Sequence, residues 1–157
     1  MKRLAKIVLG TAALLATMPC AVAQQGPGER EAQAHLPQAR SPLWGILRMT
    51  RITVDDARGL FTASHPPAVR ALVGKTLTFT GFIMPLNAAA SGNHFLLSKY
   101  TPVCPFCPPG EPNEVVEVHT AQPIVYSDKM VNVTGKFGLE NNGDNGLFFQ
   151  LASASVR

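Results

Sequence analysis

Two cysteines separated by two residues carry the strongest chemical signal in this chain. Cys104 and Cys107 lie in Lys99–Glu114, KYTPVCPFCPPGEPNE, which holds five of the thirteen prolines. Proline interrupts helices and is excluded from interior strands. The flanking segments are rich in strand-forming residues. The pattern predicts a stiff loop displayed between two strands, with any chemistry placed there.

The first chemistry that this loop suggests is metal binding. Tetrahedral zinc is bound by Cys sulfur and His nitrogen, and a Cys-x-x-Cys pair supplies half of such a site. His119, twelve residues after Cys107, is the expected third ligand. His94 and Glu114 compete for the fourth position. We therefore expect that zinc, or an ion like it, is the cofactor if there is one.

Two other interpretations of the cysteine pair stay open. A disulfide that only pins the loop suits an oxidising compartment and ranks level with the metal site. Thiol-disulfide exchange ranks lower, because it normally rests on a thiolate at a helix N-terminus, and Pro108, Pro109 and Gly110 leave no room for a helix. No nucleophile elbow or phosphate-binding loop is present in the sequence. A non-catalytic binding domain is the expected class.

The N-terminus predicts export. Lys2 and Arg3 precede an apolar run from Ile7 to Met18, and Ala21-Val22-Ala23 follows as a cleavage signal. We expect residues 1–23 to be a signal peptide and the mature protein to be periplasmic. Cys20 lies in a poor lipobox, so a lipid anchor is not expected and membrane association would come only through partners.

The overall positive charge belongs mainly to this leader. The chain has a net charge of +4, but three of its fourteen basic residues lie in the signal peptide, which leaves eleven against ten acidic residues. The composition therefore gives no reason to expect nucleic-acid binding. Residues 24–42 are poor in large apolar side chains and predict a flexible leader. Residues 43–157 suit one domain.

Five short strands are expected in that domain. They are Thr76–Met84, His94–Tyr100, Val115–Thr120, Lys129–Phe137 and Leu147–Ala152. In the first, the apolar alternation changes parity at Gly81, which predicts a β-bulge there. Closure protects the edges of so short a sheet. We expect a mainly β fold, a small five-stranded OB-like barrel with one or two short helices, and a β-sandwich as the alternative.

Three features are expected before the first barrel strand. Trp44, Ile46 and Leu47 form an anchoring segment. Asp55 or Asp56 caps a short helix that runs to Phe61. Pro66-Pro67 opens a helical turn that ends at Gly74, with proline at the start and glycine at the end.

The chain resembles a family of small exported proteobacterial proteins known as a domain of unknown function. The resemblance rests on Gly74-Lys75, Gly81-Phe82, Pro85-Leu86, Phe95-Leu96-Leu97, the Cys104–Pro109 motif and Pro112-Asn113. It covers roughly Trp44 to the C-terminus. Glu114 stands where the family tends to have Gln. The resemblance implies a setting beside ABC-transporter components and a link with metal handling, so envelope transporter components are the expected partners.

Overall fold

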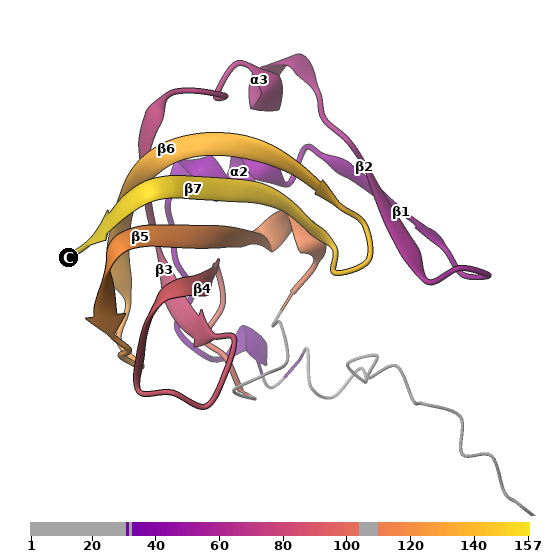
Figure 1. Ribbon diagram of the computed structural model, residues 1–157. Helices are drawn as coiled ribbons and strands as arrows, with labels where there is room; N and C mark the ends of the chain where they lie inside the picture. Colours follow the sequence, from indigo (N-terminus) through magenta and orange to yellow (C-terminus); the bar gives the residue numbers. More distant parts are fainter. Residues whose placement is uncertain (1–30, 32, 104–109) are drawn as a thin grey trace, which may run out of the picture.

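A closed five-stranded barrel is the main feature of the computed structural model, which describes residues 31, 33–103 and 110–157 (Figure 1). Its strands are β3 (Thr76–Pro85), β4 (Ser91–Ser98), β5 (Val115–Val125), β6 (Val131–Asn142) and β7 (Leu147–Val156). They close in the order β3-β4-β5-β7-β6, with β5 and β7 parallel and the other pairs antiparallel. The predicted mainly β, five-stranded OB-like barrel is confirmed.

Alternate residues of each strand fill the barrel interior. Phe95 and Leu97 of β4 and Val116 and Val118 of β5 are fully buried in the main core. Aromatic rings extend this core across the barrel: Phe79, Phe137 and Phe149 stack in sequence, with ring centroids 6.2 and 6.1 Å apart. Burial of one such ring contributes about 1.5–3 kcal/mol. The inward positions fix, by alternation, which side chains of β4 and β5 face outward.

Helix α2 (Pro42–Leu47) anchors the preceding segment to the barrel. Pro42 begins the helix, where its missing N–H costs nothing. Trp44 is 1% exposed, donates its indole N–H to the Thr80 carbonyl at 2.8 Å, and packs edge-on against Phe79. Burial of Trp44 and Leu47 confirms the expected anchoring segment.

A second short helix, α3 (Pro67–Arg70), leads into the barrel. It starts after Pro66, and Gly74 adopts a left-handed φ of +79° four residues beyond its end. Glycine takes this conformation without the steric cost of a side chain. The predicted turn between Pro66-Pro67 and Gly74 is confirmed. Among the described residues, none of the helices is long and apolar enough to cross a membrane.

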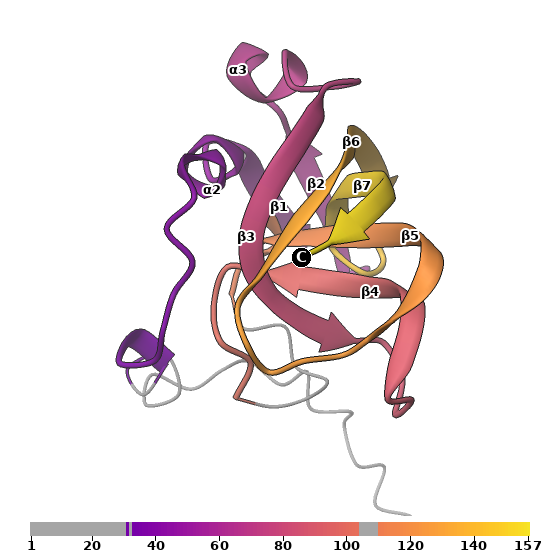
Figure 2. The same ribbon diagram turned by 90° about the vertical axis from the view of Figure 1, so that its left-hand side faces the viewer.

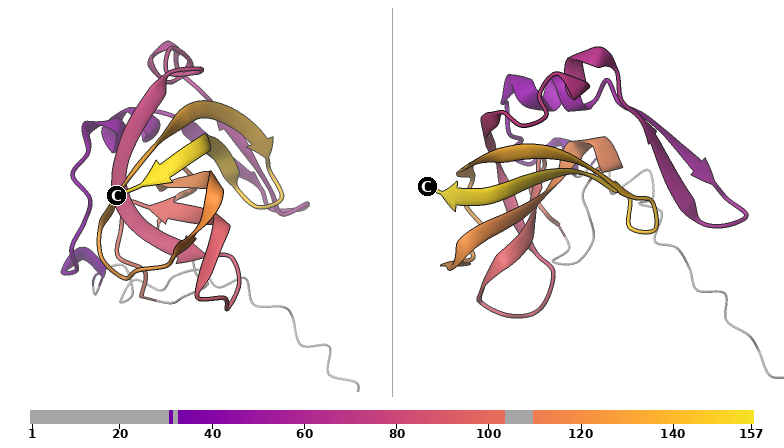
Figure 3. Two further views of the ribbon diagram at one scale, coloured as in Figure 1. Left: turned by 60° about the vertical axis from the view of Figure 1, so that its left-hand side comes forward. Right: turned by 45° about the horizontal axis from the view of Figure 1, so that its top comes forward.

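The helix expected between Asp55 and Phe61 is wrong. This part of the chain forms a two-stranded antiparallel hairpin, β1 (Arg51–Asp55) and β2 (Leu60–Ser64), which projects away from the barrel (Figure 3). The Asp55 carboxylate accepts hydrogen bonds from the backbone and guanidinium of Arg58, and Gly59 takes a φ of +65°. Asp55 thus stabilises a turn instead of capping a helix.

The expected flexible leader also differs from the structure over its described C-terminal part. Residues 33–42 lie along the side of the barrel and lead into α2 (Figure 2). Ala39 is buried in the main core and its N–H donates to the Lys99 carbonyl at 2.8 Å, while Thr101 donates its hydroxyl to the Pro37 carbonyl. Backbone hydrogen bonds hold this segment to the barrel, because its small side chains bury little apolar surface. The packed unit therefore begins before the expected boundary at residue 43.

The predicted bulge at Gly81 is wrong as well. Strand β3 pairs with β6 from Thr76 to Gly81 and with β4 from Phe82 to Pro85, without a register shift in either ladder. The alternation of apolar residues changes parity because the second half of β3 is buried on both of its faces. Ile83 points into the main core, whereas Met84 joins a second cluster with Leu96 and Val115. Gly81 is required for close approach: a Cβ there would lie 2.6 Å from the Ser98 carbonyl oxygen.

We expect Gly81→Ala to lower the free energy of unfolding by about 1–3 kcal/mol, the range for overpacking a filled core. Gly138→Ala in β6 is the matched control, because a Cβ there would meet no atom within 4 Å. Denaturant unfolding of both variants measures the difference. Equal stabilities would show that the contact with β4 does not constrain β3.

His65 lies half-buried between the hairpin and the barrel. Its ring packs edge-on against Phe149 with centroids 5.5 Å apart, and its Nδ1 shares a hydrogen bond with the Thr50 hydroxyl. These contacts give His65 a role in packing the hairpin against the barrel. Burial first, and then the Arg70 charge, lower the pKa of His65 below its ordinary value of 6.5.

This shift makes stability depend on pH with a definite sign. Because the folded state binds the His65 proton less tightly than the unfolded chain, stability is lost as pH falls from 6.5 through the lowered pKa. We expect the loss of melting temperature on acidification to be smaller in His65→Gln than in wild type. His35→Gln, at an exposed position, is the control. Identical pH profiles for His65→Gln and wild type would contradict the assignment.

Candidate functional site

Two of the histidines that the sequence suggested as ligands lie side by side on the outer face of the barrel. His94 of β4 and His119 of β5 are direct cross-strand partners. Their neighbours Phe95 and Val118 point into the core, so the two imidazoles point out. The rings stack with centroids 4.2 Å apart and 17° between their planes. The structure therefore brings both predicted histidine ligands together.

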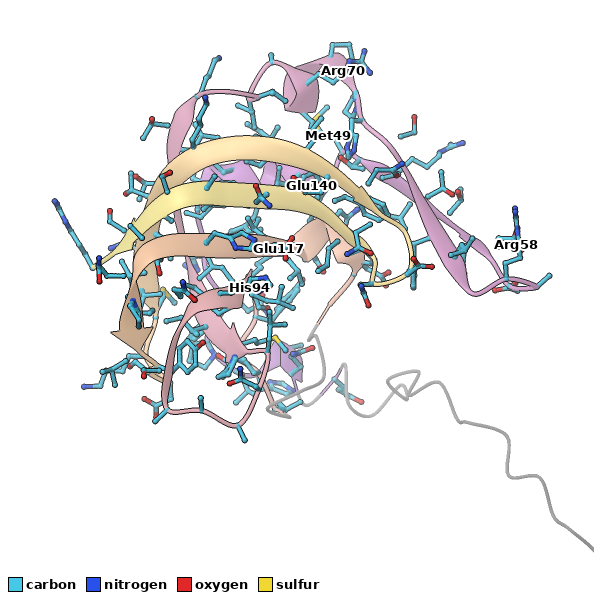
Figure 4. The ribbon with its side chains drawn as sticks, in the orientation of Figure 1. Met49, Arg58, Arg70, His94, Glu117 and Glu140 are labelled. Atoms are coloured by element: carbon cyan, nitrogen blue, oxygen red, sulfur yellow. The ribbon has the colours of Figure 1, made fainter. Side chains whose placement is uncertain are left out.

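Glu117 completes a group of three potential metal ligands. It lies two residues before His119 on β5 and therefore faces the same side. One carboxylate oxygen, Oε1, lies 2.6 Å from His94 Nε2 and 3.5 Å from His119 Nε2. Figure 4 shows His94 and Glu117 on neighbouring strands at this face. All three ligand atoms lie within 4.8 Å of one another.

Local packing explains how the group is held. Leu96, the cross-strand partner of Glu117, belongs to the second apolar cluster and is 5% exposed. This apolar neighbour shields the Glu117 side chain, which is 14% exposed, whereas both histidines are more than 40% exposed. The β4–β5 ladder has a register shift between Gly92 and His94, and the Tyr126 hydroxyl donates a hydrogen bond to the His94 carbonyl. The low exposure of Glu117 thus leaves its carboxylate little freedom, while the two imidazoles stay accessible to solvent.

Glu114, another expected ligand, has a different role. It is 5% exposed and its carboxylate accepts hydrogen bonds from the Tyr100 hydroxyl at 2.9 Å and the Lys99 ammonium at 3.1 Å. Arg48 Nε lies 3.3 Å away. A buried carboxylate with three such partners is already neutralised and hydrogen-bonded. Glu114 is a buried ion-pair residue in this structure and lies outside the His94–Glu117–His119 group, so its expected role as a metal ligand stays a prediction.

This ion pair anchors both ends of the proline-rich loop. Lys99 stands at its start, and Glu114 closes the 3-10 helix η1 (Pro112–Glu114) at its end. Burial lowers the pKa of Lys99, but hydrogen bonds to Tyr100 and Glu114 outweigh that effect and raise it overall. Lys99 therefore stays charged and paired. The Lys99 N–H also donates to the Glu114 carbonyl, so backbone and side chains join the same two residues.

Cys104 and Cys107 lie outside the described residues. The ladder nevertheless locates the histidine pair relative to the base of the loop. His94 and His119 are four positions along β4 and β5 from the last pair, Ser98 and Val115. At about 3.3 Å per residue this is about 13 Å. The His94–Glu117–His119 group therefore stands as a candidate site made of strand residues alone.

Glu117 is not among the ligands expected from the sequence. The signal was present, because Glu117 and His119 share strand parity in V-V-E-V-H. What the sequence lacked was the register that places His94 opposite His119. Two imidazoles and a carboxylate on one rigid face are a set that zinc and similar divalent ions accept.

Comparison with known proteins gives the family but no activity. A family model described as a protein of unknown function, DUF3299, matches residues 31–149. The chain belongs to the DUF3299 family. This agrees with the resemblance to a domain of unknown function. A search of curated proteins gives no match. A crystal structure of a DUF3299 family protein from Pseudomonas aeruginosa PAO1 is similar at 24% identity and a TM-score of 0.48, covering 78% of this chain and 87% of that one.

Proposed function

We propose that this DUF3299 domain is an exported, non-catalytic binding protein that holds a divalent ion of the zinc type through His94, Glu117 and His119. The observation that carries the proposal is the placement of these three side chains on one face of the β4–β5 ladder, with their ligand atoms within 4.8 Å. The position also suits the fold. By analogy, OB barrels commonly bind ligands on the face of their second and third strands, which are β4 and β5 here.

One of the two ligand distances fits tetrahedral coordination as it stands. Ligand atoms about 2.0–2.1 Å from zinc are about 3.4 Å apart in a tetrahedron. Glu117 Oε1 lies 3.5 Å from His119 Nε2, close to that value, whereas its 2.6 Å distance to His94 Nε2 is a hydrogen bond that a bound ion would replace. Small side-chain rotations would bring the ligands to an ion without moving the strands. The pre-formed ladder also reduces the ordering cost of binding.

The surroundings favour reversible binding over catalysis. Both histidines are more than 40% exposed, whereas the fourth position that three protein ligands leave open is shared with catalytic zinc sites and does not separate the two roles. Enzyme sites are normally concave, yet the residues that line the two hollows described in this fold do not include His94, Glu117 or His119. An exposed site suits an ion that is taken up and passed on. An ABC-type envelope transport system, which the sequence resemblance implies, would be a suitable recipient.

The proposal predicts zinc binding that depends on all three residues. After chelator treatment, zinc affinity measured by competition with a chromophoric chelator should fall at least about tenfold in His94→Ala, His119→Ala and Glu117→Gln. Zinc affinity should also fall as the pH is lowered, since protons compete with the ion for the imidazole nitrogens. Glu140→Gln changes an exposed carboxylate of β6 and is the matched control.

Further variants separate this site from its alternatives. Cys104→Ser and Glu114→Gln should keep wild-type zinc affinity. If Cys104→Ser loses affinity while His94→Ala keeps it, the cysteine pair is the metal site and the proposal fails. Equal affinity in all variants would leave the three residues as a hydrogen-bonded surface group and favour a disulfide-stabilised binding module.

Export is the second part of the proposal. It rests on the charged start, the apolar run from Ile7 to Met18 and the Ala21-Val22-Ala23 signal. An extracytoplasmic site would meet ions before they enter the cell. A low-affinity, accessible surface site is useful in that position because it exchanges quickly.

We expect the mature protein to begin at Gln24. Expression of the full chain in a Gram-negative host, followed by osmotic release and intact-mass measurement, tests this. Ala23→Asp, which disrupts the small-residue signal, should block processing at this position. A mature protein that begins with a lipid-modified Cys20 would overturn the expectation and place the domain on a membrane.

A further inference from the structure

A groove on the opposite part of the fold has no role in the proposed metal site. It has a volume of about 790 Å³ and lies between residues 34–41 and α2, with Lys99 at its edge. This is within the range of about 300–1,000 Å³ that small-molecule sites occupy. Figure 2 shows the segment before α2 running along one side of the barrel, with β5 on the other side. The volume is sufficient for a metabolite-sized ligand.

The charged residues that line this groove are basic, and one of them, Arg48, also lines a neighbouring hollow together with Glu111 and Glu114. The lining residues described by the structure include Arg40, Arg48, Lys99 and His35, and no Asp or Glu. Lys99 and Arg48 share the carboxylate of Glu114, which lies outside this lining. In the described part of the chain, no carboxylate lies within ion-pair distance of Arg40. Arg40 is thus the charge in this groove that has no ion-pair partner in the described part of the chain, whereas Lys99 and Arg48 are paired with Glu114.

The helix that forms one wall leaves the groove open. Gly45 of α2 lines the groove, is exposed, and has no atom within 4 Å of where a Cβ would lie. Glycine in a helix costs about 0.5–1 kcal/mol relative to alanine. Close packing and positive φ do not account for it here, since Gly45 has neither. The absence of a side chain keeps space free beside Arg48.

We infer that this groove binds a small organic or inorganic oxyanion, a carboxylate or a phosphate. Arg guanidinium groups bind both kinds of anion with paired hydrogen bonds. Arg48 Nε lies 3.3 Å from Glu114 Oε1, and the Arg48 side chain is still 58% exposed. Arg40 and Arg48 would hold the anion, and Lys99 would add to the local potential. The inference is independent of the metal site.

Calorimetric titration of metal-free mature protein with citrate, inorganic phosphate and glycerol tests the inference. Citrate or phosphate should bind saturably, more weakly as salt is raised, and glycerol should not bind. Arg40→Gln should weaken binding about tenfold or more, the effect of losing one hydrogen bond to a charged group. Binding of only one anion identifies the ligand as carboxylate or phosphate.

Space-filling variants make the result specific to the groove. Gly45→Leu should abolish binding by occupying the open volume, whereas Gly45→Ala should bind as wild type does. His94→Ala, which removes a proposed metal ligand, should leave anion binding unchanged. The inference is overturned if neither anion binds or if Gly45→Leu binds like wild type. Thermal melts of each variant exclude loss of folding as the cause.

Discussion

The shared pairing of β3 is the constraint on which the rest of the structure depends. The strand bonds to β6 with its first half and to β4 with its second, and the change occurs at Gly81. The Ser98 carbonyl comes so close there that a Cβ would lie 2.6 Å from it. This contact closes the barrel and removes the open edges of a short sheet. It also fixes β4, and with it every position on the β4–β5 ladder.

Along β4 and β5, core residues alternate with the candidate metal ligands, so the two sets lie on opposite faces of the sheet. Phe95 and Val118 enter the core, while their neighbours His94, Glu117 and His119 face outward. A slip of one residue would bury three polar side chains and expose the apolar ones. The hydrophobic core therefore fixes the strand register on which the candidate metal site depends, although none of the three candidate ligands belongs to the core. Stability of the barrel and geometry of the site have the same physical origin.

The sequence predicted what depends on local pattern and missed what depends on register. Five strands, the anchoring Trp44 and the turn ending at Gly74 follow from periodicity and from proline and glycine placement. Gly81 was misinterpreted because a parity change has two causes, a bulge or burial on both faces, and only tertiary packing distinguishes them. The hairpin β1–β2 was missed because Asp55 stabilises a turn as readily as a helix start. Grouping His94 with Glu117 required the pairing of distant strands.

Glu114 and Glu117 show how environment assigns different roles to the same residue type. They are three residues apart, yet Glu114 is buried among Lys99, Tyr100 and Arg48, and Glu117 faces two accessible imidazoles. A carboxylate surrounded by fixed cations has no capacity left for an ion. Glu114 also neutralises part of the positive charge near the groove, through Lys99 and Arg48. The proposed cation site on the ladder and the proposed anion site beside α2 thus rest on different side chains.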